Sequence, residues 1–145
     1  MKTSLITFKR LTALAVFSVI ATFSFAQSQP LVISNSTGCT YKVEIKAADE
    51  GNCNNKCVSI DSPVCVGPND VVFVDPCGNA DYYYAVVVTP MDDDCRNICG
   101  TAASVASLPV SQCWTNLSAG TGGGEHCDCG DFTARFDTDF ELVIE

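Results

Sequence analysis

The sequence is poor in the residues and motifs that catalysis uses. It has one histidine, His126, in 145 residues, so any Ser-His-Asp or Cys-His site would depend on it, yet no Gly-x-Ser-x-Gly motif is present. The glycine-rich segment 120–124 lacks the Lys-Ser/Thr pair of a phosphate-binding loop and reads as a hinge or a hairpin tip. No Cys-x-x-Cys redox motif occurs either. We therefore expect no catalytic residue, no enzyme activity and a surface position for His126.

Basic residues are also scarce. The chain has 8 Lys and Arg against 17 Asp and Glu, and three of the basic residues lie in the first ten positions. Without that segment, five basic residues remain and the net charge is −12. Binding of a phosphate backbone or an anionic membrane surface depends on clustered Lys and Arg. We therefore expect no nucleic-acid partner and no attachment to an anionic membrane.

No apolar run is long enough for a permanent membrane span. Lys2, Lys9 and Arg10 precede an apolar stretch of about 15 residues, against the roughly 20 that a span needs. Small residues at Ser24 and Ala26 then fit a signal-peptidase site. We predict a signal peptide at residues 1–26 and one domain at 27–145, without membrane insertion after cleavage. The expected location is secreted or extracellular, or periplasmic if the protein is retained there. No cysteine lies directly at the cleavage site, where it could accept a lipid, which argues against a lipoprotein.

What the chain does have is ten cysteines, all downstream of the predicted signal. An even number in an exported chain indicates a disulfide framework of up to five bridges. Cys127 and Cys129 are too close in sequence to pair with each other, and the same applies to the two Cys-x3-Cys pairs. We therefore expect bridges over longer separations. The disulfide residues are predicted to be Cys39, Cys53, Cys57, Cys65, Cys77, Cys95, Cys99, Cys113, Cys127 and Cys129.

A zinc site is the main alternative for some of these cysteines. Its residues would be those of the segment Glu125-His126-Cys127-Asp128-Cys129. Structural zinc sites usually pair cysteines two to four residues apart, whereas Cys127 and Cys129 have one residue between them. Thiols in an oxidising compartment are also more often consumed as disulfides. We therefore expect neither a bound metal nor another cofactor.

Alternation of apolar and polar residues is the clearest secondary-structure signal. It predicts half-buried strands at residues 41–46, 132–136 and 140–144, and a hairpin is favoured over one long bent strand for the last two. β-Branched and aromatic runs predict further strands at residues 31–34, 71–74 and 82–89. The run 82–89 is apolar on both faces and is expected to be central. Residues 101–110 and 113–117 are weaker candidates for strand or loop.

Helix has little support in this sequence. Acidic residues before Cys95–Cys99 and a glycine after it allow one or two helical turns, and both this segment and residues 53–57 are interpreted as a loop or a single helical turn. Short strands separated by turn residues predict an all-β fold, a single antiparallel β-sandwich of immunoglobulin-like architecture, with a barrel as second choice. The spacing of Trp114 from the cysteines does not fit the immunoglobulin disulfide pattern, so the likeness ends at architecture.

Carboxylates are plentiful and leave two chemical alternatives. Asp92–Asp94, and a group at Asp128, Asp131, Asp137 and Asp139, could hold calcium, although no complete calcium-loop motif occurs. Glycoside hydrolysis needs two carboxylates across a cleft, for which a sheet-filled domain of this size leaves little room. We interpret these residues as solvated acidic loops.

By elimination, the favoured function is a secreted, non-catalytic extracellular module. It would be a structural or adhesive subunit of a cell surface or filament, or a binding domain. Its expected partner is a protein or glycan at the cell surface, or further copies of itself, with residues 27–34 as a strand to be added to a neighbour's sheet. The alternative is a small secreted enzyme inhibitor, presenting residues 52–63 as a braced loop, or a small hydrolase.

Overall fold

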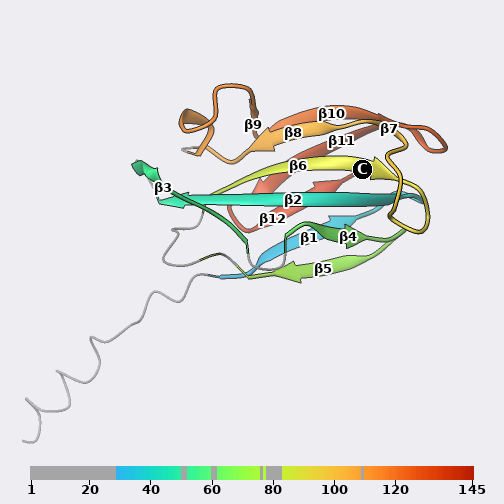
Figure 1. The fold of residues 1–145 in the computed structure, drawn as a ribbon, viewed down its shortest axis with the longest axis horizontal. Helices are drawn as coiled ribbons and strands as arrows, with labels where there is room; N and C mark the ends of the chain where they lie inside the picture. The colour runs from blue at the N-terminus through green and yellow to red at the C-terminus, as the bar shows by residue number, and fades with distance from the viewer. Residues whose placement is uncertain (1–28, 50–51, 60–61, 76, 78–82, 109) are drawn as a thin grey trace, which may run out of the picture.

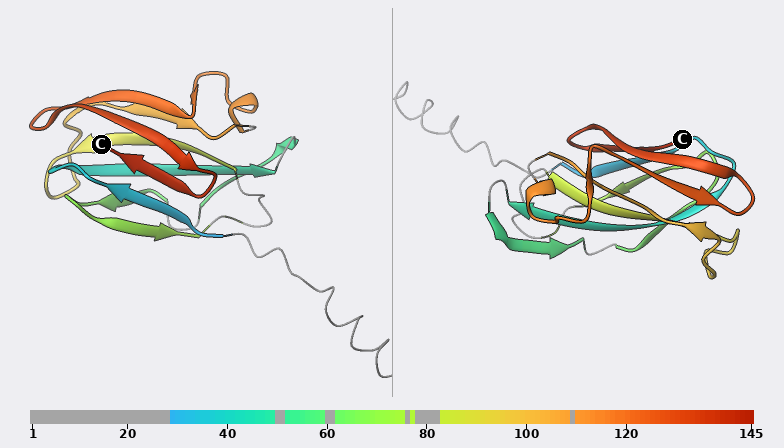
Figure 2. Two further views of the ribbon diagram at one scale, coloured as in Figure 1. Left: turned by 180° about the vertical axis from the view of Figure 1, so that it is seen from behind. Right: turned by 90° about the horizontal axis from the view of Figure 1, so that it is seen from above.

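The computed structural model describes residues 29–49, 52–59, 62–75, 77, 83–108 and 110–145 (Figure 1). In these residues twelve strands form two separate sheets, and one short 3-10 helix lies outside them. The sheets pack face to face as two layers (Figure 2), so the predicted β-sandwich is confirmed and the barrel is not closed. The expected signal peptide lies outside the described residues. Within them, no helix has the length and apolar character needed to cross a membrane.

The first sheet has six strands in the order β5-β1-β12-β11-β10-β7. Their bounds are β1 (Leu31–Asn35), β5 (Val71–Val74), β7 (Gly100–Thr101), β10 (Thr121–His126), β11 (Gly130–Thr138) and β12 (Glu141–Ile144). β1 and β12 pair in parallel, and the other pairs of this sheet are antiparallel.

The second sheet has the order β3-β2-β6-β8-β9, and β4 also pairs with β2. Its strands are β2 (Thr40–Asp49), β3 (Asn52–Val58), β4 (Val64–Val66), β6 (Tyr83–Met91), β8 (Ala103–Ala106) and β9 (Ser118–Ala119). β8 and β9 are parallel. Both sheets are therefore mixed, although antiparallel pairs dominate.

The strands predicted from alternation are confirmed. Residues 41–46 lie in β2 with the odd positions buried. Residues 132–136 and 141–144 form the β11–β12 hairpin rather than one bent strand, with a shift of register between Phe136 and Thr138. The apolar run from residue 83 is β6, the middle strand of the second sheet; Tyr82 lies outside the described residues.

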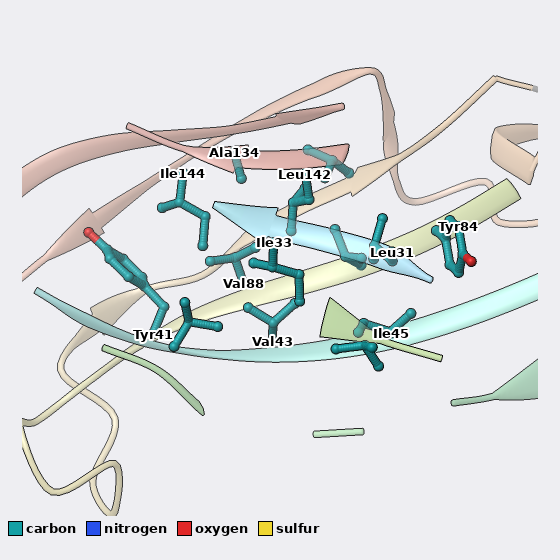
Figure 3. Packing of buried hydrophobic residues seen from close by; sticks show 14 of the residues in the cluster. Leu31, Ile33, Tyr41, Val43, Ile45, Tyr84, Val88, Ala134, Leu142 and Ile144 are labelled. Carbon is teal, nitrogen blue, oxygen red and sulfur yellow. The ribbon is translucent and has the colours of Figure 1, made fainter. Parts of the chain in front are cut away.

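The core fills the space between the two sheets. Figure 3 shows Leu31 and Ile33 of β1 facing Val43 and Ile45 of β2, and all four side chains are fully buried. Tyr41 and Tyr84 lie at opposite ends of this layer. Burial of side chains of this size stabilises the fold by about 1.5 to 3 kcal/mol each, so this interface is the main source of stability.

A second, smaller cluster covers the outer face of β6. It contains buried Ala48, Ala85, Ala106 and Val110, with Cys113, Trp114 and Leu117 packed against it. The helix η1 (Val110–Gln112) and the turn after it supply this cover. The first half of β6 is therefore buried on both faces, as its sequence predicts. Residues 113–117, a candidate for strand or loop, form turns.

Two segments interpreted as loops are strands. The glycine-rich segment, expected to be a hinge or tip, is β10, and residues 53–57 lie in β3. In β10 the glycines make room for a neighbour: a Cβ on Gly122 would lie 2.6 Å from Val105 Cγ1 of β8. A Cβ on Gly124 would lie 2.5 Å from the ring of Phe132. Close packing, not flexibility, therefore explains these glycines.

The segment Cys95–Cys99 has no helical turn, in agreement with the loop alternative of its interpretation. This segment is a loop in which Asp92 Oδ1 accepts hydrogen bonds from the backbone N–H groups of Arg96 and Asn97, at 2.7 and 3.1 Å. The side-chain amide of Asn97 also donates to Asp92. These bonds, led by the one from Arg96, hold the pKa of Asp92 below its ordinary value. The carboxylate closes a tight loop and does not begin a helix.

Candidate functional site

All ten cysteines form disulfides, as predicted. Each bridge spans at least 20 residues, and none joins the close neighbours that the spacing excludes. The pairs are Cys39–Cys129, Cys53–Cys113, Cys57–Cys77, Cys65–Cys95 and Cys99–Cys127. Five bridges in one small domain are typical of proteins outside the reducing cytosol.

The bridges fasten the margins of the sandwich. Cys39–Cys129 connects the start of β2 to the β10–β11 turn, and so ties the two sheets together. β3 carries two bridged cysteines, and β4 carries one. The short strand β7 follows Cys99, which is bridged to the end of β10. β5 is therefore the longest edge strand without a cysteine of its own.

His126 is buried, so the predicted surface position is wrong. Its side chain is 3% exposed and lies edge-on to the ring of Tyr41, with the centroids 5.4 Å apart. Nδ1 accepts a hydrogen bond of 3.1 Å from the backbone N–H of Asp128. Because Nδ1 accepts, Nε2 carries the proton and donates to the Met91 carbonyl at 2.9 Å. Both ring nitrogens are thus engaged in holding the β10–β11 turn.

A shallow hollow of ≈ 430 Å³ lies on the opposite face of β10. Glu125 and Asp131 stand directly across from one another on its rim, and both are exposed. Side chains alternate along a strand, so His126 points away from this hollow and toward the core. The histidine and the two carboxylates therefore do not converge on one point, as a hydrolytic site would need.

A second hollow of ≈ 300 Å³ lies beside the single tryptophan. Its lining residues are Lys46, Lys56, Cys57, Val58 and Trp114. The ammonium of Lys56 lies 4.9 Å from the Trp114 ring centroid and donates to the Cys113 carbonyl at 3.0 Å. Lys46 pairs with Glu44 at 3.1 Å. Both cations have partners, and Lys56 occupies a face of the indole that a sugar ring would stack on.

The carboxylates considered for calcium do not gather. Asp92 closes its own loop, and Asp137 pairs with Arg135, which also binds Glu145 at 3.0 Å. In the described part of the chain, groups of three or more metal-ligating side chains occur only around His126. Those groups consist mainly of cysteines that are already bridged.

The most distinctive surface is the free edge of the first sheet, at β5. Val71 and Phe73 are 49% and 67% exposed, while Val72 and Val74 turn inward. Figure 1 shows β5 at the lower margin of the sandwich. β7 and β9, the other outermost strands of the two sheets, have two residues each, and β3 is polar. Among the described edge strands of four or more residues, β5 alone combines an apolar sequence, exposure and an open side.

The outer edge of β5 presents backbone groups that pair with no other strand in the described part of the chain. Asn35 N–H donates to the Asp70 carbonyl at 3.0 Å, so residues 35 and 70 form a hydrogen-bonded pair. Val32 N–H points to the other side and donates to Phe140 at 2.8 Å. Antiparallel pairs alternate, so Val72 bonds β1 while the N–H and C=O groups of Val71 and Phe73 face outward. This row is a template for another strand.

Asp70 covers one end of this row. Its Oδ1 accepts a hydrogen bond of 2.8 Å from Val71 N–H, which confirms that this N–H points away from β1. Asp75 flanks the other end of the strand. Natural proteins often protect open edges with charged residues, and here the charges stand beside the strand, leaving Val71–Val74 uncharged.

Comparisons with known proteins add no relative. The chain matches no protein-family model, no curated protein and no solved structure.

The sequence predicts the strand at residues 71–74, which is β5, but it does not predict that β5 is an open edge. Of the proposed donor strand, residues 27–34, the part from Leu31 onward belongs instead to β1, which lies between β5 and β12, and residues 27 and 28 lie outside the described residues. A signal was present: Val71–Val74 lies between Asp70 and Asp75, and charged residues flanking a short apolar strand are typical of a guarded edge. The braced loop of the inhibitor alternative is the edge strand β3 at residues 52–58.

Proposed function

We propose that the protein is a secreted, non-catalytic structural or adhesive subunit of an extracellular assembly, and that its copies associate through β5. The observation that carries this proposal is the exposed apolar edge at Val71 and Phe73. A row of backbone groups without a strand partner among the described residues, beside two large apolar side chains, supplies both the hydrogen bonds and the buried area that strand addition needs.

The edge is complementary to itself. In an antiparallel pair of two β5 strands centred on Val72, Val71 of one copy lies opposite Phe73 of the other. The backbone N–H and C=O groups of Val71 and Phe73 point outward, so each Val71–Phe73 pair between the copies forms two hydrogen bonds, one in each direction. The side chains of each pair then lie on the same face and form an apolar contact. An interface with this two-fold symmetry uses the same patch on both copies.

The charges near β5 tolerate this register. Asp70 lies opposite Val74 of the second copy, and Asp75 lies opposite Asn69, so no two carboxylates face each other directly. Like charges directly opposite one another destabilise a pair of strands. A pairing confined to β5 is small, and interfaces of small area are typically weak and transient. We expect a dissociation constant on the order of 0.1 mM, equivalent to about −5.5 kcal/mol.

The disulfides support an extracellular role for such a subunit. They cross-link β3, β4 and the segment before β7, which lie at the margins of the sheets, where strands would otherwise fray. A chain of this length can build a core without bridges, so the bridges add durability. That durability suits a protein that meets proteases or mechanical stress outside the cell.

The test is a charge placed on the edge strand. A lysine at Phe73 is the kind of residue that blocks natural edges, and Phe73→Lys should weaken self-association at least about tenfold. Leu108 is exposed to the same degree, 68%, but lies outside β5. Leu108→Lys is therefore the matched control for lost exposed area and added charge. Sedimentation velocity over a concentration series measures both variants, and equal association of Phe73→Lys and the wild type would reject the proposal.

A further inference from the structure

His126 lies between two disulfides. One of its ring nitrogens, the sulfurs of Cys99 and Cys127 and a carboxylate oxygen of Asp128 all lie within 4.8 Å of one another. The sulfurs of Cys39 and Cys129 form a second such group with the same histidine. No other part of the described chain brings this combination of sulfur, nitrogen and oxygen atoms together.

Asp128 already contacts the first disulfide. Its Oδ2 lies 3.3 Å from Cys127 Sγ and 3.9 Å from Cys99 Sγ. A disulfide gives a carboxylate no proton to bond, so this close approach gains little while the bridge is intact. The same positions would suit the oxygen of a shared metal ion once the two sulfurs are thiolates.

The orientation of His126 also matches that of a metal ligand. Nε2–H donates to the Met91 carbonyl at 2.9 Å, and the Nδ1 lone pair points to the Cys127–Cys129 turn, where it accepts a hydrogen bond from Asp128 N–H that a metal ion would replace. Metal-binding histidines usually donate their other ring N–H to a carbonyl or carboxylate, which fixes the ring. This fixing bond is already present in the oxidised protein.

We propose that reduction of the Cys99–Cys127 disulfide creates a zinc site from Cys99, Cys127, His126 and Asp128. A dithiol reductant transfers two electrons to the bridge and becomes a disulfide itself, leaving two protein thiols. Zinc binding then displaces both thiol protons to solvent and gives a site of two sulfurs, one nitrogen and one oxygen. This set fits the tetrahedral preference of Zn²⁺.

The required movement is small. Zinc–ligand bonds of about 2.0 to 2.3 Å place the ligands of a tetrahedral site roughly 3.3 to 3.8 Å apart. The four ligand atoms lie within 4.8 Å of one another at present, so no distance has to shorten by more than about 1.5 Å, while the two sulfurs, bonded to each other now, move apart after reduction. Cys127 and Asp128 are exposed and Cys99 is half-buried, so solvent and a reductant can reach this bridge. The inference is independent of association through β5.

Cys65–Cys95 provides a matched control. It too joins one exposed and one half-buried cysteine, and it spans 30 residues against 28 for Cys99–Cys127. It belongs to no group of metal-ligating side chains within the described residues. Zinc binding after reduction should therefore occur at Cys99 and Cys127 and not at Cys65 and Cys95.

The test begins with the wild-type protein, so that it does not depend on whether a variant folds. The protein is treated with dithiothreitol without denaturant and freed of reductant under anaerobic conditions. It is then alkylated with and without zinc chloride, and the modified cysteines are identified by mass spectrometry. Zinc should slow alkylation of Cys99 and Cys127 at least about tenfold and leave Cys65 and Cys95 unchanged. Equal protection of both pairs, no protection, or a Cys99–Cys127 bridge that stays closed while the fold persists would overturn the proposal.

Cobalt(II) titration supplies the second readout. The reduced wild type should develop the sulfur-to-cobalt charge-transfer absorption of thiolate ligands, and zinc should displace it. Cys65→Ser with Cys95→Ser should keep this absorption, whereas Cys99→Ser with Cys127→Ser should lose it. His126→Gln should weaken binding at least about tenfold. Unchanged cobalt binding in the Cys99 and Cys127 double variant would contradict the assigned ligands.

Discussion

Asp70 Oδ1 accepts a hydrogen bond of 2.8 Å from the backbone N–H of Val71, on the side of β5 that has no neighbouring strand. In the self-paired edge, this N–H donates to Phe73 of the second copy. The carboxylate therefore competes with association, and it adds a negative charge beside the interface.

Asp70→Ala should strengthen self-association. The substitution frees Val71 N–H in both copies, and a net gain of about 0.5 to 1.5 kcal/mol per hydrogen bond predicts at least about a fivefold lower dissociation constant. Asp70→Asn removes the charge but keeps an acceptor oxygen, and should change association much less. Sedimentation velocity distinguishes the two, and equal effects of both variants would mean that the charge alone matters.

Gly122→Ala should destabilise the fold, whereas Gly123→Ala should not. A Cβ at Gly122 would meet Val105 Cγ1 at 2.6 Å and the Ser104 carbonyl oxygen at 2.8 Å, but one at Gly123 meets nothing closer than 3.9 Å. Overpacking of this kind costs about 1 to 3 kcal/mol in the free energy of unfolding. Urea unfolding with intact disulfides measures it. Similar losses for both variants would show that β10 is not packed against β8 as described.

Tyr84 should make the fold sensitive to alkali. Burial, with a smaller contribution from the negative charge of Asp75, raises the pKa of Tyr84 from 10.0 to about 12. The unfolded chain therefore loses this proton from about pH 10, while the folded chain keeps it until about pH 12. This contribution to stability is complete below pH 10 and is lost as the pH rises to 12. The neutral hydroxyl donates to the Gln29 carbonyl at 3.0 Å.

Rapid spectrophotometric titration after a pH jump checks this behaviour before alkali damages the disulfides. The wild type should show one more late-titrating tyrosine than Tyr84→Phe does. Tyr41, whose pKa burial also raises, stays in both proteins and serves as an internal reference. Identical titration curves per remaining tyrosine in the two proteins would contradict the assignment.

The sequence predicts the fold well where apolar and polar side chains alternate, because the alternation shows which side chains are buried. In β2, buried Tyr41, Val43 and Ile45 alternate with more exposed Lys42, Glu44 and Lys46, so the strand and its inner face are both evident. β11 and β12 follow the same rule. Alternation depends only on the pleat of one strand, so it needs no knowledge of the neighbours.

The prediction fails where a strand lacks such side chains. β10 contains three glycines, which have no preference for a buried or an exposed face, and the close contacts that explain Gly122 and Gly124 come from Val105 of β8 and Phe132 of β11. β3 is mostly polar because it lies at an edge of its sheet, where side chains on both of its faces are near solvent. The sequence does not determine the disulfide partners either, because the pairing depends on which strands become neighbours in the fold.

The site residues show the same division. The disulfide state of all ten cysteines follows from their number and from the predicted export signal, but the burial of His126 does not. Its sequence neighbours, Glu125 and Cys127, are exposed, and the acceptor that retains the ring is the Met91 carbonyl, 35 residues away. A polar side chain becomes a core residue only when such a distant partner satisfies it.

Hydrogen exchange at the Phe73 amide tests association through β5 most directly. In the single molecule this N–H points outward without a strand partner, whereas Val72 N–H bonds to β1. We predict that exchange at Phe73, followed residue by residue by NMR, slows as protein concentration rises through about 0.1 mM, while exchange at Val72 stays slow throughout. Fast exchange at Phe73 in a sample that sedimentation shows to be associated would contradict the account, because the copies would then meet through another surface.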